Sequence, residues 1–373
     1  MRRIFILSIS LSICLLACKN RQNSTPDIKT GEVLYKTAST AADTLRFPEE
    51  KHLRNIKQLT FGGNNAEAYF SFDNKSLVFQ SDYRNWGVEC DQIFYFDLAD
   101  GSMKQKPKMV STGLGRTTCA YFMPGNQEMV YASTHLKDVK CPEKPPHIRG
   151  KYLWPVYESF DIFTTDKTGK IIKQLTNTPG YDAEATVSPK GDKIVFTSTR
   201  SGDLELWTMN IDGSNQKQIT DGLGYDGGAF FSPDGKKLVF RASRPKAEEE
   251  IKEYKDFLAK GLVAPSKMEI YTCNVDGSDL KQITNLGNAN WAPFFHPSGN
   301  KIIFSSNHAT KGGFKFNLFM TDLDGKNIEQ ITFDPVFDAF PMFSFDGKKL
   351  VFSSNRNNGG THDTNVFLAD WID

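Results

Sequence analysis

The sequence predicts an all-β fold, a six-bladed β-propeller made of four-stranded blades. Its main support is a Lys-Gln-Leu/Ile-Thr motif, or a close variant, that occurs six times along the chain. The copies begin at Lys57, Lys108, Lys173, Lys217, Lys281 and Glu329. The last residues of two neighbouring copies, Thr176 and Thr220, are 44 positions apart, and a four-stranded blade takes about 40 to 45 residues. This regular spacing indicates a repeat architecture in which each repeat is one blade.

The segments between motif copies predict the remaining strands of each blade. A short apolar strand and a second strand rich in Val, Ile and Phe flank a tight turn, as in residues 229–235 and 237–240. Pro and Asp-Gly supply the turn geometry between two paired strands. A third strand follows in every repeat, and we expect these strands at 93–97, 161–164, 206–210, 270–274, 318–322 and 366–370.

The two ends of the repeat region complement each other. The last repeat lacks a fourth strand, because the chain ends at Asp373 soon after strand 366–370. The first motif strand, 56–60, has no partner in its own repeat. We therefore expect strand 56–60 to pair beside strand 366–370 and close the ring, which removes exposed strand edges.

The amino terminus predicts export. Arg2 and Arg3 precede an apolar run, residues 4–16, that is too short to span a bilayer comfortably and is typical of a signal peptide. The run ends in Leu-Leu-Ala-Cys, which resembles the lipobox of bacterial lipoproteins. An ordinary signal peptide that happens to end in a cysteine is the alternative.

The lipobox resemblance implies three segments. Residues 1–17 would be a lipoprotein signal peptide, residues 18–50 a lipidated Cys18 followed by a polar, flexible tether, and residues 51–373 the propeller. Lys19 after the cysteine implies, by the same resemblance, an outer-membrane lipoprotein that faces the periplasm.

The repeat also resembles a known family. The Ser-Pro-Asp-Gly-Lys turn at 232–236, a Val-Phe strand after it and a Met-Asn-Ile-Asp-Gly-Ser hairpin at 209–214 are similar to the repeat of TolB-like propellers. TolB itself has an amino-terminal α/β domain, for which the predicted tether is too short, and this weakens the case for a role in the Tol system. Propellers carry many unrelated activities, so the resemblance implies a fold more than a function.

A ring of small polar or acidic residues precedes the first strand of every blade. Where the residue in this ring is aspartate, an arginine follows the second strand of the same repeat, and a guanidinium matches a carboxylate in two hydrogen bonds. We expect these pairs to be structural clasps: Asp182–Arg200, Asp226–Arg244 and Asp338–Arg356. In two other repeats the ring residue is Thr117 or Asn290 and the second residue is His135 or His308. A ligand-binding role for the paired charges is the alternative.

Other polar and aromatic residues are expected near the same end of the channel without partners of this kind. We predict that they bind a ligand: Glu67, Arg116, Glu184, Trp291, Tyr152, Trp154, His308 and His362.

Two repeats carry long insertions between their second and third strands, and these should lie at that same end. The first, 136–159, is rich in aromatic residues and proline and contains Tyr152 and Trp154. The second, 245–268, contains a predicted helix with Ile251, Tyr254 and Leu258 on one face, which we expect to dock on the propeller itself. Insertions gather where function sits, although packing over the blade would explain them equally well.

Four cysteines remain after the signal peptide and Cys18, in a compartment that permits disulfides. We predict a Cys119–Cys141 disulfide, with Cys90–Cys119 as the alternative, and Cys273 as a buried thiol. No Cys-x-x-Cys pair of a zinc site is present.

The expected function is that of a lipid-anchored binding or scaffold protein for a peptide, a glycan or an envelope protein. No catalytic signature such as Gly-x-Ser-x-Gly or His-Glu-x-x-His occurs, and we predict no cofactor and a monomer. The formal net charge is +1 with scattered basic residues, which argues against nucleic acid as a partner. The alternative is a metal-dependent oligosaccharide lyase or hydrolase that uses channel histidines, since oligogalacturonide lyases resemble TolB-like propellers, although those have seven blades.

Overall fold

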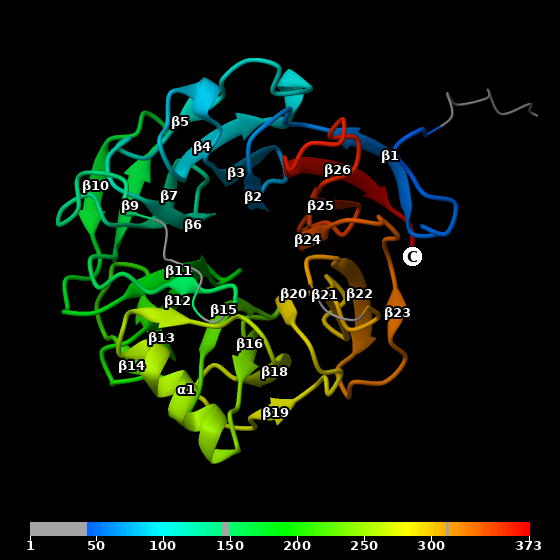
Figure 1. Cartoon of the computed structure of the whole chain (residues 1–373). Coiled ribbons are helices and arrows are strands. Elements are labelled where there is room, and N and C mark those ends of the chain that lie inside the picture. Colours follow the sequence, from blue (N-terminus) through cyan, green and yellow to red (C-terminus); the bar gives the residue numbers. More distant parts are fainter. Residues whose placement is uncertain (1–42, 144–147, 149, 311–312) are drawn as a thin grey trace, which may run out of the picture. The chain divides into compact units, whose positions relative to one another are not determined.

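The computed structural model describes residues 43–373 except 144–147, 149 and 311–312. The predicted signal peptide, Cys18 and most of the predicted tether lie outside the described residues. Six four-stranded antiparallel sheets follow one another around a ring, as Figure 1 shows for the propeller. The predicted all-β, six-bladed fold is therefore confirmed.

The first three blades each use four strands in chain order. Blade 1 contains β2 (Asn65–Phe70), β3 (Ser76–Ser81), β4 (Gln92–Asp97) and β5 (Lys108–Met109). Blade 2 contains β6 (Thr117–Phe122), β7 (Glu128–Ser133), β9 (Asp161–Asp166) and β10 (Ile171–Gln174). Blade 3 contains β11 (Asp182–Val187), β12 (Lys193–Ser198), β13 (Glu205–Asn210) and β14 (Lys217–Gln218). Short 3-10 helices, η1 (Arg84–Trp86) and η2 (Leu98–Asp100), occupy loops of blade 1.

The last three blades complete the ring. Blade 4 contains β15 (Asp226–Phe231), β16 (Lys237–Ser243), β18 (Met268–Asn274) and β19 (Lys281–Gln282). Blade 5 contains β20 (Asn290–Phe295), β21 (Lys301–Ser306), β22 (Asn317–Asp322) and β23 (Glu329–Gln330). Blade 6 contains β24 (Asp338–Phe343), β25 (Lys349–Ser354), β26 (Asn365–Trp371) and β1 (Leu53–Gln58).

The ring closes in the predicted way. β1 pairs antiparallel with β26, with Leu53 opposite Trp371 and Gln58 opposite Phe367. The innermost strands of neighbouring blades contact one another all the way round, including β24 of blade 6 with β2 of blade 1. The amino-terminal strand thus supplies the fourth strand of the last blade.

The described part of the chain begins at Asp43, and its residues before the expected propeller start at 51 already contact the propeller. Glu50 is fully buried and pairs with Arg356 of blade 6, with 2.9 Å between Oε1 and Nη2. Its carboxylate also accepts a hydrogen bond from the backbone N–H of Phe333. Leu45 packs against the apolar cluster between the last two blades. The end of the predicted tether is therefore part of the propeller.

Every innermost strand contains a β-bulge at the same position. The strand register shifts there in all six blades. One residue of each bulge has a positive φ: Glu67 (54°), Cys119 (44°), Glu184 (59°), Gly228 (59°), Ala292 (44°) and Phe340 (56°). A bulge re-aims a side chain, and positive φ is uncommon for residues other than glycine. The six bulges form one ring of specialised positions around the channel.

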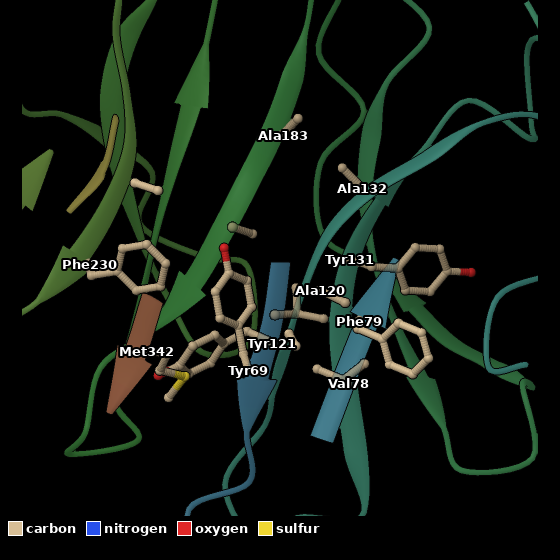
Figure 2. Packing of buried hydrophobic residues seen from close by; sticks show 14 of the residues in the cluster. Tyr69, Val78, Phe79, Ala120, Tyr121, Tyr131, Ala132, Ala183, Phe230 and Met342 are labelled. Atoms are coloured by element: carbon tan, nitrogen blue, oxygen red, sulfur yellow. The ribbon is translucent and has the colours of Figure 1, made fainter. Parts of the chain in front are cut away.

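Aromatic side chains fill the channel beyond the bulges. The Tyr69 ring lies 5.7 Å from the Tyr121 ring and 5.3 Å from the Phe230 ring, and these residues belong to three different blades. Figure 2 shows them pointing toward one another, with Met342 of a fourth blade beside them. This cluster joins the blades at the centre, because each ring buries apolar surface against a neighbouring blade.

The single α-helix of the described residues is α1 (Glu248–Leu258), as predicted. Phe257 is buried, and Tyr254 and Leu258 pack partly against the main core. The Tyr254 hydroxyl donates a hydrogen bond to Asp203 in a loop of blade 3. The helix therefore docks on its own propeller, and no helix in the described part of the chain is long and apolar enough to cross a membrane.

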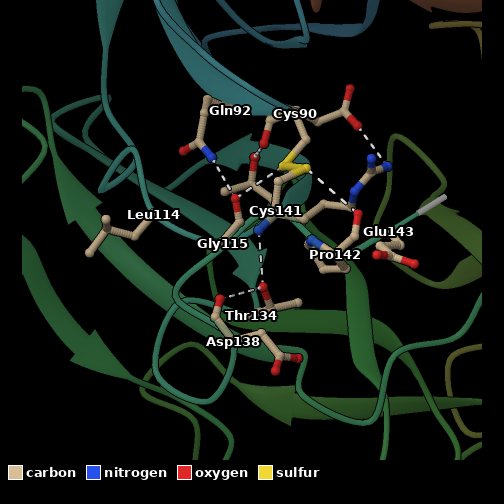
Figure 3. The surroundings of a disulfide bond; sticks show 12 residues. Cys90, Gln92, Leu114, Gly115, Thr134, Asp138, Cys141, Pro142 and Glu143 are labelled. Carbon is tan, nitrogen blue, oxygen red and sulfur yellow. Dashed lines mark hydrogen bonds and ion pairs between the residues drawn. A yellow bond between two sulfur atoms is a disulfide. The ribbon is translucent and has the colours of Figure 1, made fainter.

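The disulfide joins Cys90 to Cys141, so the predicted Cys119–Cys141 pair is wrong, as is its alternative. Cys119 occupies a bulge on the innermost strand and is a buried free thiol, as is Cys273. Cys90 lies in a loop of blade 1 next to blade 2, where its sulfur lies 3.2 Å from the backbone oxygen of Gly115. Figure 3 shows the bond bracing these neighbouring loops. Because Cys119 lies on the innermost strand β6, it is not placed beside the insertion that carries Cys141.

Candidate binding site

Two insertions meet at one end of the channel. We call the end that carries the loops between second and third strands the decorated mouth, and the opposite end, with the hairpins between first and second strands, the turn mouth. At the decorated mouth, β8 (Trp154–Pro155) pairs antiparallel with β17 (Leu262–Val263), which comes from the other insertion. An ion pair between Lys151 and Glu253 joins the first insertion to α1. We call β8, β17 and α1 the lid.

The lid reaches across to blade 5. The Trp154 ring lies 5.2 Å from the ring of Trp291, which belongs to β20. The Trp291 indole N–H donates a hydrogen bond of 2.9 Å to the backbone oxygen of Pro265, and its ring stacks on Phe316. Trp154 of the lid and Trp291 of blade 5, both predicted to bind ligand, thus pack against each other.

Beneath the lid, Glu184 belongs to a buried polar network. Its carboxylate forms an ion pair with Arg241 and accepts hydrogen bonds from Thr197 Oγ1 (2.7 Å), the Tyr225 hydroxyl (2.7 Å) and the Gly228 backbone N–H (2.8 Å). Burial alone would raise the pKa of Glu184, but Arg241 and these donors hold it below its ordinary value. Glu184, predicted to bind ligand, is a charged, fully engaged member of the core.

Arg241 was missed by the sequence analysis, although it organises this network. Its guanidinium lies 5.1 Å from the Trp154 ring and 5.0 Å from the Tyr225 ring, between the lid and blade 4. Gly228 makes room for it, since a Cβ there would lie 1.8 Å from the Arg241 Nη1 atom. The signal in the sequence was Gly228 itself, at a bulge where most other blades have a larger residue.

An open apolar cavity lies at the turn mouth instead. It has a volume of about 130 Å³, and side chains from five consecutive blades line it: Tyr121, Val187, Pro189, Phe230, Phe231, Pro233, Phe294, Phe295, Pro297, Phe343, Ser344 and Phe345. The rings of Phe230 and Phe294 meet edge to face at 5.1 Å on its wall. Concave, mostly apolar pockets are the usual form of ligand sites.

This cavity was not predicted from the sequence, because the residues on the cavity rim were interpreted only as turn formers. The position after the turn serine is apolar in several blades, as in Pro189, Pro233 and Phe345. The hairpin turns of these blades therefore contribute apolar groups to the wall of the cavity.

Comparison with known proteins agrees with this architecture. Residues 157–256 match the sequence model of the TolB beta propeller domain. The putative TolB from Agrobacterium tumefaciens is 22% identical, with a TM-score of 0.54 over 83% of this chain and 91% of that chain. Part of this six-bladed propeller therefore resembles the TolB propeller domain. At such identity the likeness to solved structures shows the fold and not the activity.

Two further solved structures are similar to this TolB-like propeller. TolB from Acinetobacter baumannii is 18% identical, with a TM-score of 0.49 over 83% of this chain and 64% of that chain. An oligogalacturonate lyase in complex with manganese is 13% identical, with a TM-score of 0.49 over 86% of this chain and 97% of that chain.

The three aspartate–arginine contacts expected at the decorated mouth of the TolB-like propeller are present. They are Asp182–Arg200, Asp226–Arg244 and Asp338–Arg356. Each aspartate is nearly or fully buried, and Arg244 meets both oxygens of its partner. Their role as structural clasps stays a prediction.

The two histidines of the same ring contact a serine hydroxyl where the three arginines contact an aspartate. His135 Nδ1 lies 2.9 Å from Ser133 Oγ, and His308 Nδ1 lies 2.8 Å from Ser306 Oγ. Arg200 and Arg356 bind the equivalent serines of their own blades through Nε. His308 therefore occupies a structural position that arginine fills elsewhere, and burial lowers its pKa.

The geometry gives no support to a metal centre built from the decorated mouth. His362, the other histidine predicted to bind ligand, is exposed on the loop of blade 6. Within residues 43–373, as far as they are described, no three His, Cys, Asp or Glu side chains gather in a way that could hold a metal ion.

Two other predicted ligand residues lie apart from Glu184. Arg116 forms an ion pair of 2.9 Å with Asp91 at the junction of blades 1 and 2. Tyr152 is 45% exposed and meets Phe314 of blade 5 edge to face at 5.2 Å. The eight predicted residues are thus distributed over the decorated mouth and the upper channel rather than around one cavity.

Glu67 is the predicted carboxylate that keeps an unused polar group, and Arg116 likewise keeps its Nε atom without a hydrogen-bond partner in the described part of the chain. The Oε2 atom of Glu67 is buried, and among the described residues it has no hydrogen-bond partner. Burial raises the pKa of Glu67 to about 7; a hydrogen bond from Cys119 opposes this rise, while the charge of Glu184 adds to it. Glu67 therefore changes protonation near neutral pH.

Proposed function

We propose that this TolB-like propeller is a lipid-anchored binding protein of the cell envelope that holds an apolar side chain of a peptide or protein partner in the turn-mouth cavity. The observation that carries the proposal is the cavity itself, lined by aromatic side chains and proline from five blades. Such a lining suits an aromatic or aliphatic anchor residue of a partner. A glycan would need more convergent polar groups than Ser344 offers.

The compartment belongs to the same proposal. The lipobox at Cys18 supports an outer-membrane lipoprotein that faces the periplasm, where the Cys90–Cys141 disulfide can form. Intact mass spectrometry of the protein purified from membranes tests this part. We expect a chain that begins at Cys18 and carries acyl groups, and a Cys18→Ala variant without them; an unacylated native chain contradicts it.

Site-specific photo-crosslinking tests the binding site. A photoreactive phenylalanine analogue at Phe345, on the cavity rim, should capture a defined partner segment in intact cells, because that position meets the proposed anchor residue. The matched control carries the same analogue at Ile328, which is 38% exposed directly before an outer strand. Phe345→Asp should abolish capture by a second probe at Val187 while the melting curve stays close to wild type. Equal capture from positions 345 and 328 would contradict the cavity as the binding site.

A further inference from the structure

The decorated mouth carries several exposed apolar side chains in the described part of the chain. Among the described residues, most of the exposed large hydrophobic side chains lie in loops at this end. We call five of them the apolar tips: Leu114 (46% exposed), Leu136 (58%), Val139 (56%), Tyr152 (45%) and Phe314 (61%). Single exposed apolar residues are ordinary, but a group on one face marks a contact surface.

Three of the tips are held in place by a braced corner of blade 2. The Gly115 N–H, next to Leu114, donates a hydrogen bond of 2.7 Å to the Val139 backbone oxygen. The Cys90–Cys141 disulfide fixes the same loops, and Figure 3 shows Leu114 projecting away from it. These three side chains are therefore exposed on loops that the hydrogen bond and the disulfide hold in place.

The other two tips lie on the far side of the mouth. Tyr152, on the insertion of blade 2, contacts Phe314 in the loop of blade 5, and these two blades are opposite each other in the ring. The lid crosses the mouth between them, since Trp154 packs against Trp291 of blade 5 and lies over Arg241 of blade 4. This end thus presents protruding apolar groups around the lid.

Exposed lysines stand next to the tips in the sequence. Lys137 follows Leu136, Lys140 follows Val139 and Lys315 follows Phe314, and all three are exposed. Lys137 also lies 3.3 Å from Asp161 of its own blade, but its side chain remains 45% exposed. Apolar side chains flanked by basic ones suit the boundary between acyl chains and anionic headgroups.

We propose that the decorated mouth is a membrane-contact surface, with the apolar tips inserted at the headgroup level and the turn-mouth cavity directed away from the bilayer. This inference rests on the lipid anchor of the proposed function. The segment between Cys18 and Asp43 can extend to about 80 Å, so the anchor alone would not orient the propeller. The tips supply the orientation.

Vesicle binding by the full mature chain with Cys18→Ala tests this surface without the anchor. The probe is a vesicle of phosphatidylethanolamine and phosphatidylglycerol. We expect measurable partitioning of this chain, and at least tenfold weaker partitioning after Leu136→Ser, Val139→Ser and Phe314→Ser. The matched control is Ile172→Ser, Leu280→Ser and Ile328→Ser, three exposed apolar residues in or directly before outer strands, which should partition like the parent chain.

Replacing Lys137, Lys140 and Lys315 by Gln should reduce the preference for anionic over phosphatidylcholine vesicles. No partitioning of the parent chain, or equal loss in the two serine variants, overturns the proposal; so does a tip variant that keeps vesicle binding but loses a crosslinked protein. The two proposals can be contradicted separately. An unacylated Cys18 would contradict the lipid anchor, whereas partitioning that does not depend on the apolar tips would contradict only the membrane-contact surface.

Discussion

Among the described residues, Glu67 is one of three carboxyl groups with an unpaired buried oxygen, the others being Asp161 and Asp338. Glu67 sits at a bulge with a positive φ, as Glu184 does two blades away. The pKa values of the two glutamates shift in opposite directions, because Arg241 forms an ion pair with Glu184 and not with Glu67. Repeat alignment correctly placed both residues at the channel, but it could not show which had a cation beside it, since Arg241 comes from the neighbouring blade.

The raised pKa of Glu67 predicts a pH-dependent stability. Because the pKa is about 7 in the folded chain and about 4.5 in the unfolded chain, the stability that Glu67 contributes is present below pH 4.5 and is lost as pH rises through 7. We expect Glu67→Gln to gain roughly 2–3 kcal/mol in unfolding free energy relative to wild type between pH 5 and pH 8. Chemical denaturation at both pH values measures this. Parallel pH dependence of the two proteins would show that Glu67 ionises normally.

The clasp interpretation is tested at Asp226. This side chain is fully buried, and burial raises its pKa to about 6 although Arg244 opposes the shift. Asp226→Ala leaves Arg244 without its carboxylate, and we expect a loss of about 2–4 kcal/mol in unfolding free energy. Asp279→Asn, which removes the charge of an exposed carboxylate paired with Lys237, should change the unfolding free energy far less. Unchanged stability of the Asp226 variant would favour a ligand-binding role.

Strands, turns and α1 were largely predictable at the scale of single elements, because each depends on local pattern. The Lys-Gln-Leu-Thr spacing located the blades, and Pro245 with the acids after it located the helix. The pairing of β8 with β17 was not predictable, because the two segments meet only after the ring places blades 2 and 4 on either side of blade 3. The predicted disulfide connectivity was wrong for the same reason, since the bond links loops of adjacent blades.

The disulfide gives a prediction for the loops that it braces. Peptide mapping without reduction should recover Cys90 linked to Cys141, with Cys119 and Cys273 as free thiols. Cys141→Ser should lower the unfolding free energy by about 2–4 kcal/mol, as is typical for loss of a native disulfide. A Cys119→Ser variant is the control, because it leaves the bond in place. A linked peptide that contains Cys119 would contradict this connectivity.

At the scale of the whole molecule, closure depends on segments far apart in sequence. β1 completes blade 6, and the segment before it places Glu50 against Arg356. Closure itself was predictable, because a missing strand at one end matched a spare strand at the other. The packing of residues 43–50 was not, since this segment is polar and lacks the repeat pattern. Turn-mouth and decorated-mouth surfaces likewise emerge only when six blades stand side by side.

The closing strand makes the last prediction. Deleting residues up to 60 removes β1 and leaves β26 as an exposed edge, and unpaired edges recruit other chains. We expect the truncated chain to lose its cooperative melting transition and to self-associate, as measured by circular dichroism and size-exclusion chromatography. The Ile372 N–H donates a hydrogen bond of 2.9 Å to the His52 backbone oxygen. A permuted chain that starts at Phe61 and carries residues 43–60 after Asp373 through a linker should therefore fold as a monomer. Native-like melting of the truncated chain would mean that blade 6 is stable with three strands.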